Sequence, residues 1–325
     1  RDLVRSRGLG DVYKRQEEYL SLEEDKFQKI VCAYLTEYAV KYFGEEQLES
    51  NSFTYRLKTI LDNVMYLMKH IMEELSQSEF FVADCELKIG EDIPSYTIVL
   101  PDGHKIAVCG SVDRVDIMQR ADITYLRIID YKTGTKQFKL SDILYGINLQ
   151  MLLYLHSIEV SGGDKYGEIV PAGILYMPAT VPYISSDSLK SIDKLPDELN
   201  KKLKMNGLLL KDTEIIHGMD KTDVATYIPV KIKAGEPVSS TSLATLAEFG
   251  KIFKKVDMLI AEMGKNIYNG NIEAKPLKGG HDSCEYCPYD SVCAYRQSNP
   301  ITCFSVDNKT VIEEITNEIN GKEEE

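Results

Sequence analysis

The stretch LRIIDYKTGTK, residues 126–136, begins as an apolar run and ends with charged side chains. Three of its first four residues are apolar, which is typical of a buried strand. Asp130 and Lys132 follow, and the alternation of side chains along a strand puts both on one face and Tyr131 on the other. The stretch therefore predicts a buried strand that ends with an acid and a lysine side by side.

A second acid with apolar neighbours lies upstream, where GSVDRVD at residues 110–116 places Asp113 in another predicted strand. If the two strands are neighbours, Asp113, Asp130 and Lys132 meet on one face of the sheet. Glu86, within CELKIG, is available on a further strand as a third carboxylate. The sequence thus predicts a cluster of two or three acids with one lysine.

This set of side chains suits one chemistry well. Carboxylates bind Mg²⁺, which keeps several waters and also takes phosphate oxygens. The metal lowers the pKa of a bound water, and a lysine can orient or deprotonate that water and stabilise developing charge. The alternative is an ordinary salt bridge between Asp130 and Lys132, or acids at a solvated strand end, and D-Y-K taken alone favours this alternative.

The next segment, residues 141–160, has helical spacing, with Ser141 as a plausible N-cap. Gln150 and Tyr154 are four residues apart and share one face of this otherwise apolar helix. They would point polar groups at the acids, although a core hydrogen bond is the commoner role for such a pair.

The order of predicted elements indicates an α/β fold with a central mixed sheet flanked by helices. The expected helices are residues 17–44, 54–77, 141–160, 186–205 and 242–268. The expected strands are residues 80–90, 96–100, 104–118, 124–132 and 171–177.

Composition limits the environment of the protein. No run of 18 or more apolar residues occurs and no secretory signal is visible, so we expect a cytoplasmic protein with no membrane association. The net charge of -13 argues only weakly against a nucleic-acid partner, because metal-dependent nucleases need carboxylates. A basic run, NKKLKMNGLLLK at residues 200–211, could hold phosphates, but a solvated helix face is the commoner outcome.

Four segments are expected along the chain. Residues 1–16 resemble a translated sequencing adaptor, which would place the natural chain's continuation upstream; a disordered basic arm is the alternative. Residues 17–79 form an N-terminal helical segment, and residues 80–300 form the main domain with its cysteine-rich end. Residues 301–325 form an acidic tail that we expect to be disordered.

The motifs GSVDRVD, IIDYKTG and YGINLQMLLY together resemble the PD-(D/E)XK nuclease superfamily, in its RecB-like branch. The pattern is most similar to the nuclease domain of AddB-type proteins, which belong to AddAB helicase–nucleases, over roughly residues 80–300. The resemblance implies a restriction-endonuclease-like core. It implies metal ligation by Asp113, Asp130 and Tyr131, catalysis by Lys132, and DNA contact or site geometry from Gln150 and Tyr154. Glu86 matches the first acidic position of the family.

Three cysteines, Cys284, Cys287 and Cys293, stand in CEYCPYDSVC. Their spacing fits zinc or an iron–sulfur cluster almost equally, and unpaired surface cysteines are the simplest alternative. The family resemblance implies a [4Fe–4S] cluster held by this trio and one cysteine before the nuclease core. No Cys-Pro occurs near the start of this chain, so we expect the fourth ligand to lie upstream of it.

By this resemblance the protein is a Mg²⁺-dependent DNA exonuclease that partners an AddA-type helicase–nuclease subunit in double-strand-break resection. No Walker A sequence occurs in the chain. Three alternatives remain: a CRISPR-adaptation-type iron–sulfur exonuclease, a catalytically inactive nuclease-fold scaffold that binds DNA, and a zinc-stabilised binding module. Retention of Asp113, Asp130 and Lys132 argues against the scaffold, because buried charges are costly.

Overall fold

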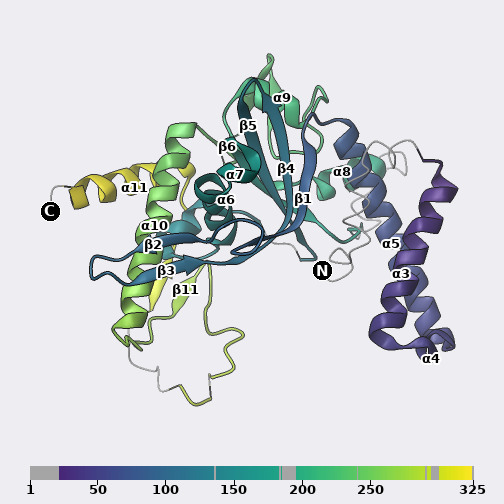
Figure 1. The fold of residues 1–325 in the computed structure, drawn as a ribbon, viewed down its shortest axis with the longest axis horizontal. Helices are drawn as coiled ribbons and strands as arrows, with labels where there is room; N and C mark the ends of the chain where they lie inside the picture. The colour runs from purple at the N-terminus through teal and green to yellow at the C-terminus, as the bar shows by residue number, and fades with distance from the viewer. Residues whose placement is uncertain are drawn as a thin grey trace.

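A six-stranded mixed sheet forms the centre of the computed structural model (Figure 1), in the order β1-β4-β5-β6-β7-β10. The β5–β6 and β7–β10 pairs are parallel and the other pairs are antiparallel. The structure describes residues 22–134, 137–182, 184, 195–239, 241–289, 291–293 and 300–323. The strands of the sheet are β1 (Phe81–Ile89), β4 (Gly110–Arg120), β5 (Ile123–Lys132), β6 (Glu168–Pro178), β7 (Asn206–Leu210) and β10 (Leu243–Ala244).

The predicted α/β architecture with a mixed sheet is confirmed, and its middle strands are buried for the reason that their sequences suggest. Leu126, Ile128 and Ile129 of β5 have no exposed surface, and Ile174 and Leu175 of the neighbouring β6 are almost equally enclosed. Apolar side chains on both faces are typical of strands that are covered on both sides. The strand expected at residues 124–132 thus corresponds to β5.

A parallel strand pair needs a crossover connection, and helix α6 (Gln150–Ser161) supplies it between β5 and β6 (Figure 1). The single helix expected at residues 141–160 was wrong. The segment divides into a 3₁₀ helix, η1 (Leu140–Tyr145), and α6, and the short helix α7 (Gly163–Tyr166) follows. Gly146 has φ 68°, a left-handed conformation that ends the first helix before α6 begins.

The N-terminal helices lie to one side of the sheet in Figure 1. They are α3 (Glu24–Phe43), α4 (Glu45–Leu48) and α5 (Asn51–Ser76). The last turns of α5 bury Met68, Ile71 and Leu75 in the core. The expected non-native segment, residues 1–16, lies outside the described residues.

Two smaller hairpins stand apart from the main sheet. They are β2 (Tyr96–Val99) with β3 (Lys105–Val108), and β8 (Lys231–Lys233) with β9 (Glu236–Val238). The strand expected at residues 104–118 is therefore two strands, because β3 pairs with β2 whereas β4 enters the central sheet. Helices α8 (Leu195–Leu203), α9 (Thr213–Met219) and α10 (Leu246–Tyr268) complete the middle of the chain.

The prediction of a disordered tail at residues 301–325 was wrong for residues 301–323. Strand β12 (Ile301–Cys303) pairs with β11 (Leu277–Gly279), and helix α11 (Asn308–Glu323) follows. The apolar residues of α11 recur every four positions and are buried: Val311, Ile315 and Ile319. An apolar stripe within an acidic segment is enough to dock a helix, and the acidic composition concealed it. None of the described helices is long and apolar enough to cross a membrane.

Candidate active site

One row of backbone positions crosses five strands of the sheet and contains all three predicted acids. The strand registers, continued by one step where the ladders stop, align these positions across neighbouring strands. Facing residues on adjacent strands present their side chains to the same face. From β1 to β7 the row reads Glu86, Asp113, Asp130, Tyr176 and Asn206.

Asp113 and Asp130 are both buried, with 7% and 4% of their surface exposed. The Oδ2 atom of Asp113 accepts a hydrogen bond from the backbone N–H of Tyr131, with 3.0 Å between the two atoms. A strand residue presents its N–H and C=O to the same neighbouring strand, so the Tyr131 carbonyl also points toward β4. Tyr131 could therefore contribute a backbone oxygen, while its side chain alternates to the other face.

These oxygens suit a divalent cation of the Mg²⁺ type. Such a cation takes one or two carboxylates and completes its shell with waters and substrate phosphates. Asp113, Asp130 and the carbonyl of Tyr131 supply that donor set. Among the residues that the structure describes, no three His, Cys, Asp or Glu side chains gather closely enough to hold a metal ion. The donor set is thus two carboxylates and a carbonyl rather than three carboxylates.

Lys132 forms an ion pair with Asp130 on the same face of β5. Its side chain is only 15% exposed, and its Nζ lies 5.4 Å from the centre of the Tyr176 ring. A cation over an aromatic face is attracted to the ring electrons, so Tyr176 helps to fix the ammonium group. Burial, together with the charges of Asp130 and Asp142, raises the pKa of Tyr176 to about 12 and keeps the phenol neutral.

Tyr176 was missed as a site residue, although the sequence carried a signal for it. It is a tyrosine near the end of an otherwise apolar strand, in PAGILYM. Only the parallel register, which sets Tyr176 beside Asp130, connects that tyrosine with the acids.

Glu86 lies on the row but has a different environment from the two aspartates. Its φ of 55° is in the left-handed region, which is unusual within a strand. Its Oε2 accepts a hydrogen bond from the Ser111 hydroxyl at 3.1 Å. The structure therefore sets Glu86 opposite Asp113 and bonds it to β4 without forming a three-acid cluster.

Gln150 and Tyr154 lie together at the start of α6. The side-chain amide of Gln150 donates to the Tyr154 hydroxyl at 3.4 Å. Tyr154 packs against Gly110, the first residue of β4, where a Cβ atom would lie 2.2 Å from the tyrosine oxygen. This close approach needs a glycine, and it places the predicted helix pair beside the strand that carries Asp113.

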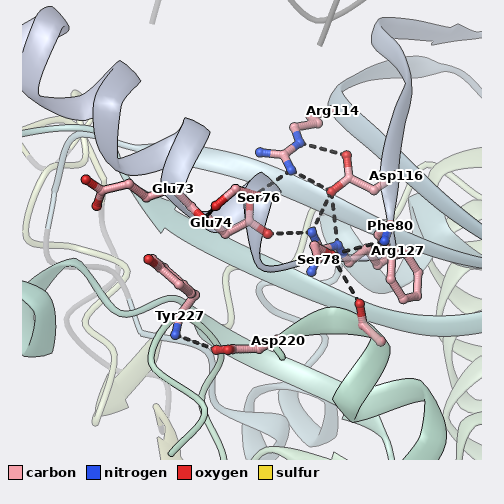
Figure 2. Close-up of polar contacts among 11 residues, drawn as sticks. Glu73, Glu74, Ser76, Ser78, Phe80, Arg114, Asp116, Arg127, Asp220 and Tyr227 are labelled. Atoms are coloured by element: carbon pink, nitrogen blue, oxygen red, sulfur yellow. Dashed lines mark hydrogen bonds and ion pairs between the residues drawn. The ribbon is translucent and has the colours of Figure 1, made fainter. Parts of the chain in front are cut away.

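The opposite face of the sheet carries four buried charges that the sequence did not predict (Figure 2). Arg114 and Arg127 alternate with the acids of the row and meet Asp116 and Glu74. The shortest contacts are 2.7 Å from Arg114 Nε to Asp116 Oδ1 and 2.6 Å from Arg127 Nη2 to Glu74 Oε1. All four side chains have 0% exposure, so this cluster joins α5 to the back of the catalytic strands.

Charge balance explains how this cluster is tolerated. Burial alone would raise the pKa of Asp116, but the two guanidinium groups beside it hold that pKa below its ordinary value. Two cations and two anions therefore neutralise one another in the interior. Arg127 also lies over the ring of Phe80, with 4.9 Å between its Cζ and the ring centre.

The cysteine trio lies between β11 and β12 and belongs to no helix or strand. Cys284 and Cys287 are half-buried, and Cys293 is exposed. Thiolates are suitable donors for iron or zinc, yet the trio is not gathered into a metal-binding group in the described part of the chain. The fit to a cluster therefore rests on donor chemistry and not on an assembled geometry.

Comparison with known proteins agrees with this geometry. The family model of the PD-(D/E)XK nuclease superfamily matches residues 9–294. Three similar proteins are each named as the second (B-type) subunit of an ATP-dependent helicase/deoxyribonuclease. The Thermoanaerobacter sp. protein is 38% identical over 246 residues, which is 74% of this chain and 21% of the relative.

The proteins of Alkaliphilus oremlandii and Clostridium kluyveri are each 36% identical, over 81% and 84% of this chain respectively, and 24% of each relative is covered. The chain thus spans about a quarter or less of the length of these relatives. The family match extends over most of the chain, and the conclusion follows that this protein belongs to the PD-(D/E)XK nuclease superfamily.

Proposed function

We propose that the protein is a Mg²⁺-dependent DNA exonuclease. The observation that carries the proposal is the meeting of Asp113, Asp130 and Lys132 at the ends of adjacent strands, in a chain of a nuclease superfamily. The relatives' names support DNA as the substrate and a helicase–nuclease as the setting. In that setting the protein would act with an AddA-type subunit in the cytoplasm, resecting double-strand breaks for recombinational repair.

In the proposed reaction Asp113, Asp130 and the carbonyl of Tyr131 hold the cation. When bound there, a divalent cation lowers the pKa of water and neutralises charge on the phosphodiester. Lys132 orients the attacking water through its Nζ and stabilises the charge that develops on the phosphate oxygens. Asp130 and the Tyr176 ring fix the ammonium group in position, so little reorganisation is needed when the substrate binds.

The test is degradation of end-labelled single-stranded DNA by the chain with Mg²⁺, prepared anaerobically. Asp130→Ala and Lys132→Ala should each abolish degradation and leave DNA binding in the absence of metal unchanged. Asp102→Asn, on the exposed β2–β3 turn, is the matched control and should cleave at the unmodified rate. Cleavage by Lys132→Ala at that rate would refute the assignment of the site.

We also propose that Cys284, Cys287 and Cys293 bind a [4Fe–4S] cluster with a fourth cysteine supplied from upstream of this chain. The three thiols lie in one loop-rich segment, and the backbone N–H of Cys287 donates to the Cys284 carbonyl at 3.2 Å, which keeps two of them in one turn. Analysis of iron, sulfide and zinc in a longer, anaerobically purified protein tests this. Zinc without sulfide would refute the cluster.

A further inference from the structure

A cavity of about 970 Å³ lies where β7 and β10 meet helix α11, and its lining is strongly basic. Among the described lining residues one acid occurs, Glu248, and its carboxylate already accepts from the N–H and hydroxyl of Thr245. The lysines of the lining are Lys201, Lys204, Lys211, Lys231, Lys233 and Lys309. Six lysines against one acid stand out in a chain of net charge -13.

The positive potential of this cavity survives the ion pairs that its lysines make. Lys201 pairs with Glu198 at 2.7 Å and Lys309 with Glu313 at 3.7 Å, and neither acid is part of the lining. In both pairs the lysine is at least 70% exposed. Exposed pairs contribute little free energy, so an anionic ligand can compete for these lysines. A cleft lined by one sign of charge also concentrates counter-ions of the other sign.

One lysine is built into the wall rather than extended into solvent. The Nζ of Lys204 donates to the carbonyls of Ala225 at 2.6 Å and Val230 at 3.0 Å, which fixes the ammonium group. Its burial lowers the pKa of Lys204. A fixed, half-buried cation at the wall distinguishes this cavity from a solvated helix face, which was the common expectation for the basic run at residues 200–211.

The remaining lining residues indicate how a ligand would be contacted. They include Met205, Val230 and Ile312, and no aromatic, histidine or arginine residue occurs among the described lining. Stacking platforms for bases are therefore absent from this part of the surface, and the contacts available are lysines for phosphates and apolar walls for sugars. The cavity is too small to enclose a duplex but can take a few nucleotides of one strand.

The cavity is close to the catalytic row. Asn206, which closes the row on β7, directly follows Met205 and Lys204 of the lining. Two strand spacings separate Asn206 from Asp130, or about 10 Å between their backbones. We propose that this cavity binds the phosphates of a single DNA strand, without sequence preference, beside the catalytic row. The proposal rests on the proposed function, because it takes DNA as the substrate.

Salt dependence of binding tests the proposal directly. The probe is a fluorescein-labelled oligothymidylate of about 20 nucleotides, and its anisotropy is measured without divalent metal from about 0.05 to about 0.2 M salt. Lys231→Gln with Lys233→Gln removes two cavity lysines from an exposed hairpin and should leave the fold intact. Lys26→Gln with Lys29→Gln, on exposed positions of α3, is a control of equal charge.

Each lost phosphate contact reduces the slope of log K against log salt by about 0.7. The cavity variant should therefore lose about 1.4 from the slope and about 20-fold in affinity near 0.1 M salt, whereas the control should match the unmodified protein. An unchanged slope in the folded cavity variant would overturn the proposal. Its charge would then suit an acidic protein surface, and binding of an acidic peptide would fall instead.

The outcome is separable from that of the proposed function. Binding is measured without metal, so it does not depend on cleavage, and Asp130→Ala should bind the probe as the unmodified protein does. If Mg²⁺ supports no cleavage but the cavity variant loses its slope, the strand-binding cavity stands and the exonuclease proposal fails. If cleavage occurs and the slope is unchanged, the reverse holds.

Discussion

The Asp113 carboxylate accepts a hydrogen bond from the backbone N–H of Tyr131, with 3.0 Å between oxygen and nitrogen. The last backbone pair in the ladder between the two strands is Arg114 with Ile129, so this bond lies just past the end of the ladder. A side chain therefore continues the connection where the backbone pairing stops. Asp113 has a structural role in addition to its proposed chemical role, and a substitution can separate the two.

Asp113→Asn should separate them. The asparagine carbonyl can still accept from the Tyr131 N–H, so the free energy of unfolding should change by less than about 1 kcal/mol. Loss of the negative charge should slow cleavage by at least about 100-fold. Asp113→Leu, which loses both roles, should also destabilise the fold by about 1–3 kcal/mol. Urea unfolding and a cleavage assay check both effects, and full activity in Asp113→Asn would remove this residue from the site.

Removal of Arg127 should be among the most destabilising single changes. Arg127→Met leaves the buried carboxylates of Glu74 and Asp116 with too little positive charge, which costs about 3–5 kcal/mol. Arg120→Met is the matched control, because Arg120 also pairs with two acids but is 38% exposed, and its loss should cost less than about 1 kcal/mol. Denaturant unfolding of the two variants compares them, and equal costs would contradict a structural role for the buried cluster.

Helix and strand periodicity predicted much of the fold, because most of its elements have one apolar face. The strand of residues 124–132 and the helix of residues 54–77 correspond closely to β5 and α5. Helix α11 was missed because the segment is acidic overall and its apolar stripe is narrow. The break between η1 and α6 depends on the left-handed φ of Gly146, which periodicity does not reveal.

The candidate site was predictable where its residues lie near one another along the chain. Asp130 and Lys132 share a face by alternation, and the structure brings Asp113 beside them. Tyr176 needed the parallel register of β5 and β6, which no local pattern fixes. The pairing of Arg127 with Glu74 joins residues 53 positions apart, so each looked like an isolated charge in an apolar segment.

His156 should make the stability of the fold depend on alkaline pH. Burial would lower its pKa, but hydrogen bonds to Asp257 and Glu159 outweigh burial and raise the pKa to about 9. Because the folded pKa exceeds the ordinary value of about 6.5, the stabilisation is complete below that value and is lost as pH rises through about 9. At about 1.4 kcal/mol per pKa unit, the shift corresponds to about 3 kcal/mol.

His156→Gln removes this titration. The difference in unfolding free energy between the unmodified protein and His156→Gln should therefore shrink between about pH 6 and about pH 10. His104→Gln changes an exposed histidine and should show a constant difference across the same range. Denaturant unfolding at several pH values measures both, and a pH-independent difference for His156→Gln would contradict the ion pairs that we assign to it.

The contact between Gly110 and Tyr154 should couple β4 to α6. A methyl group at Gly110 would lie 2.2 Å from the Tyr154 oxygen, so Gly110→Ala should displace the tyrosine and destabilise the fold by about 1–3 kcal/mol. Cleavage should also slow, because Gln150 is hydrogen-bonded to the displaced hydroxyl. In Tyr154→Ala the space is open, and Gly110→Ala should then cost almost nothing. A double-mutant cycle measured by urea unfolding should give a coupling energy of at least about 1 kcal/mol, whereas additive costs would show that the two elements pack independently.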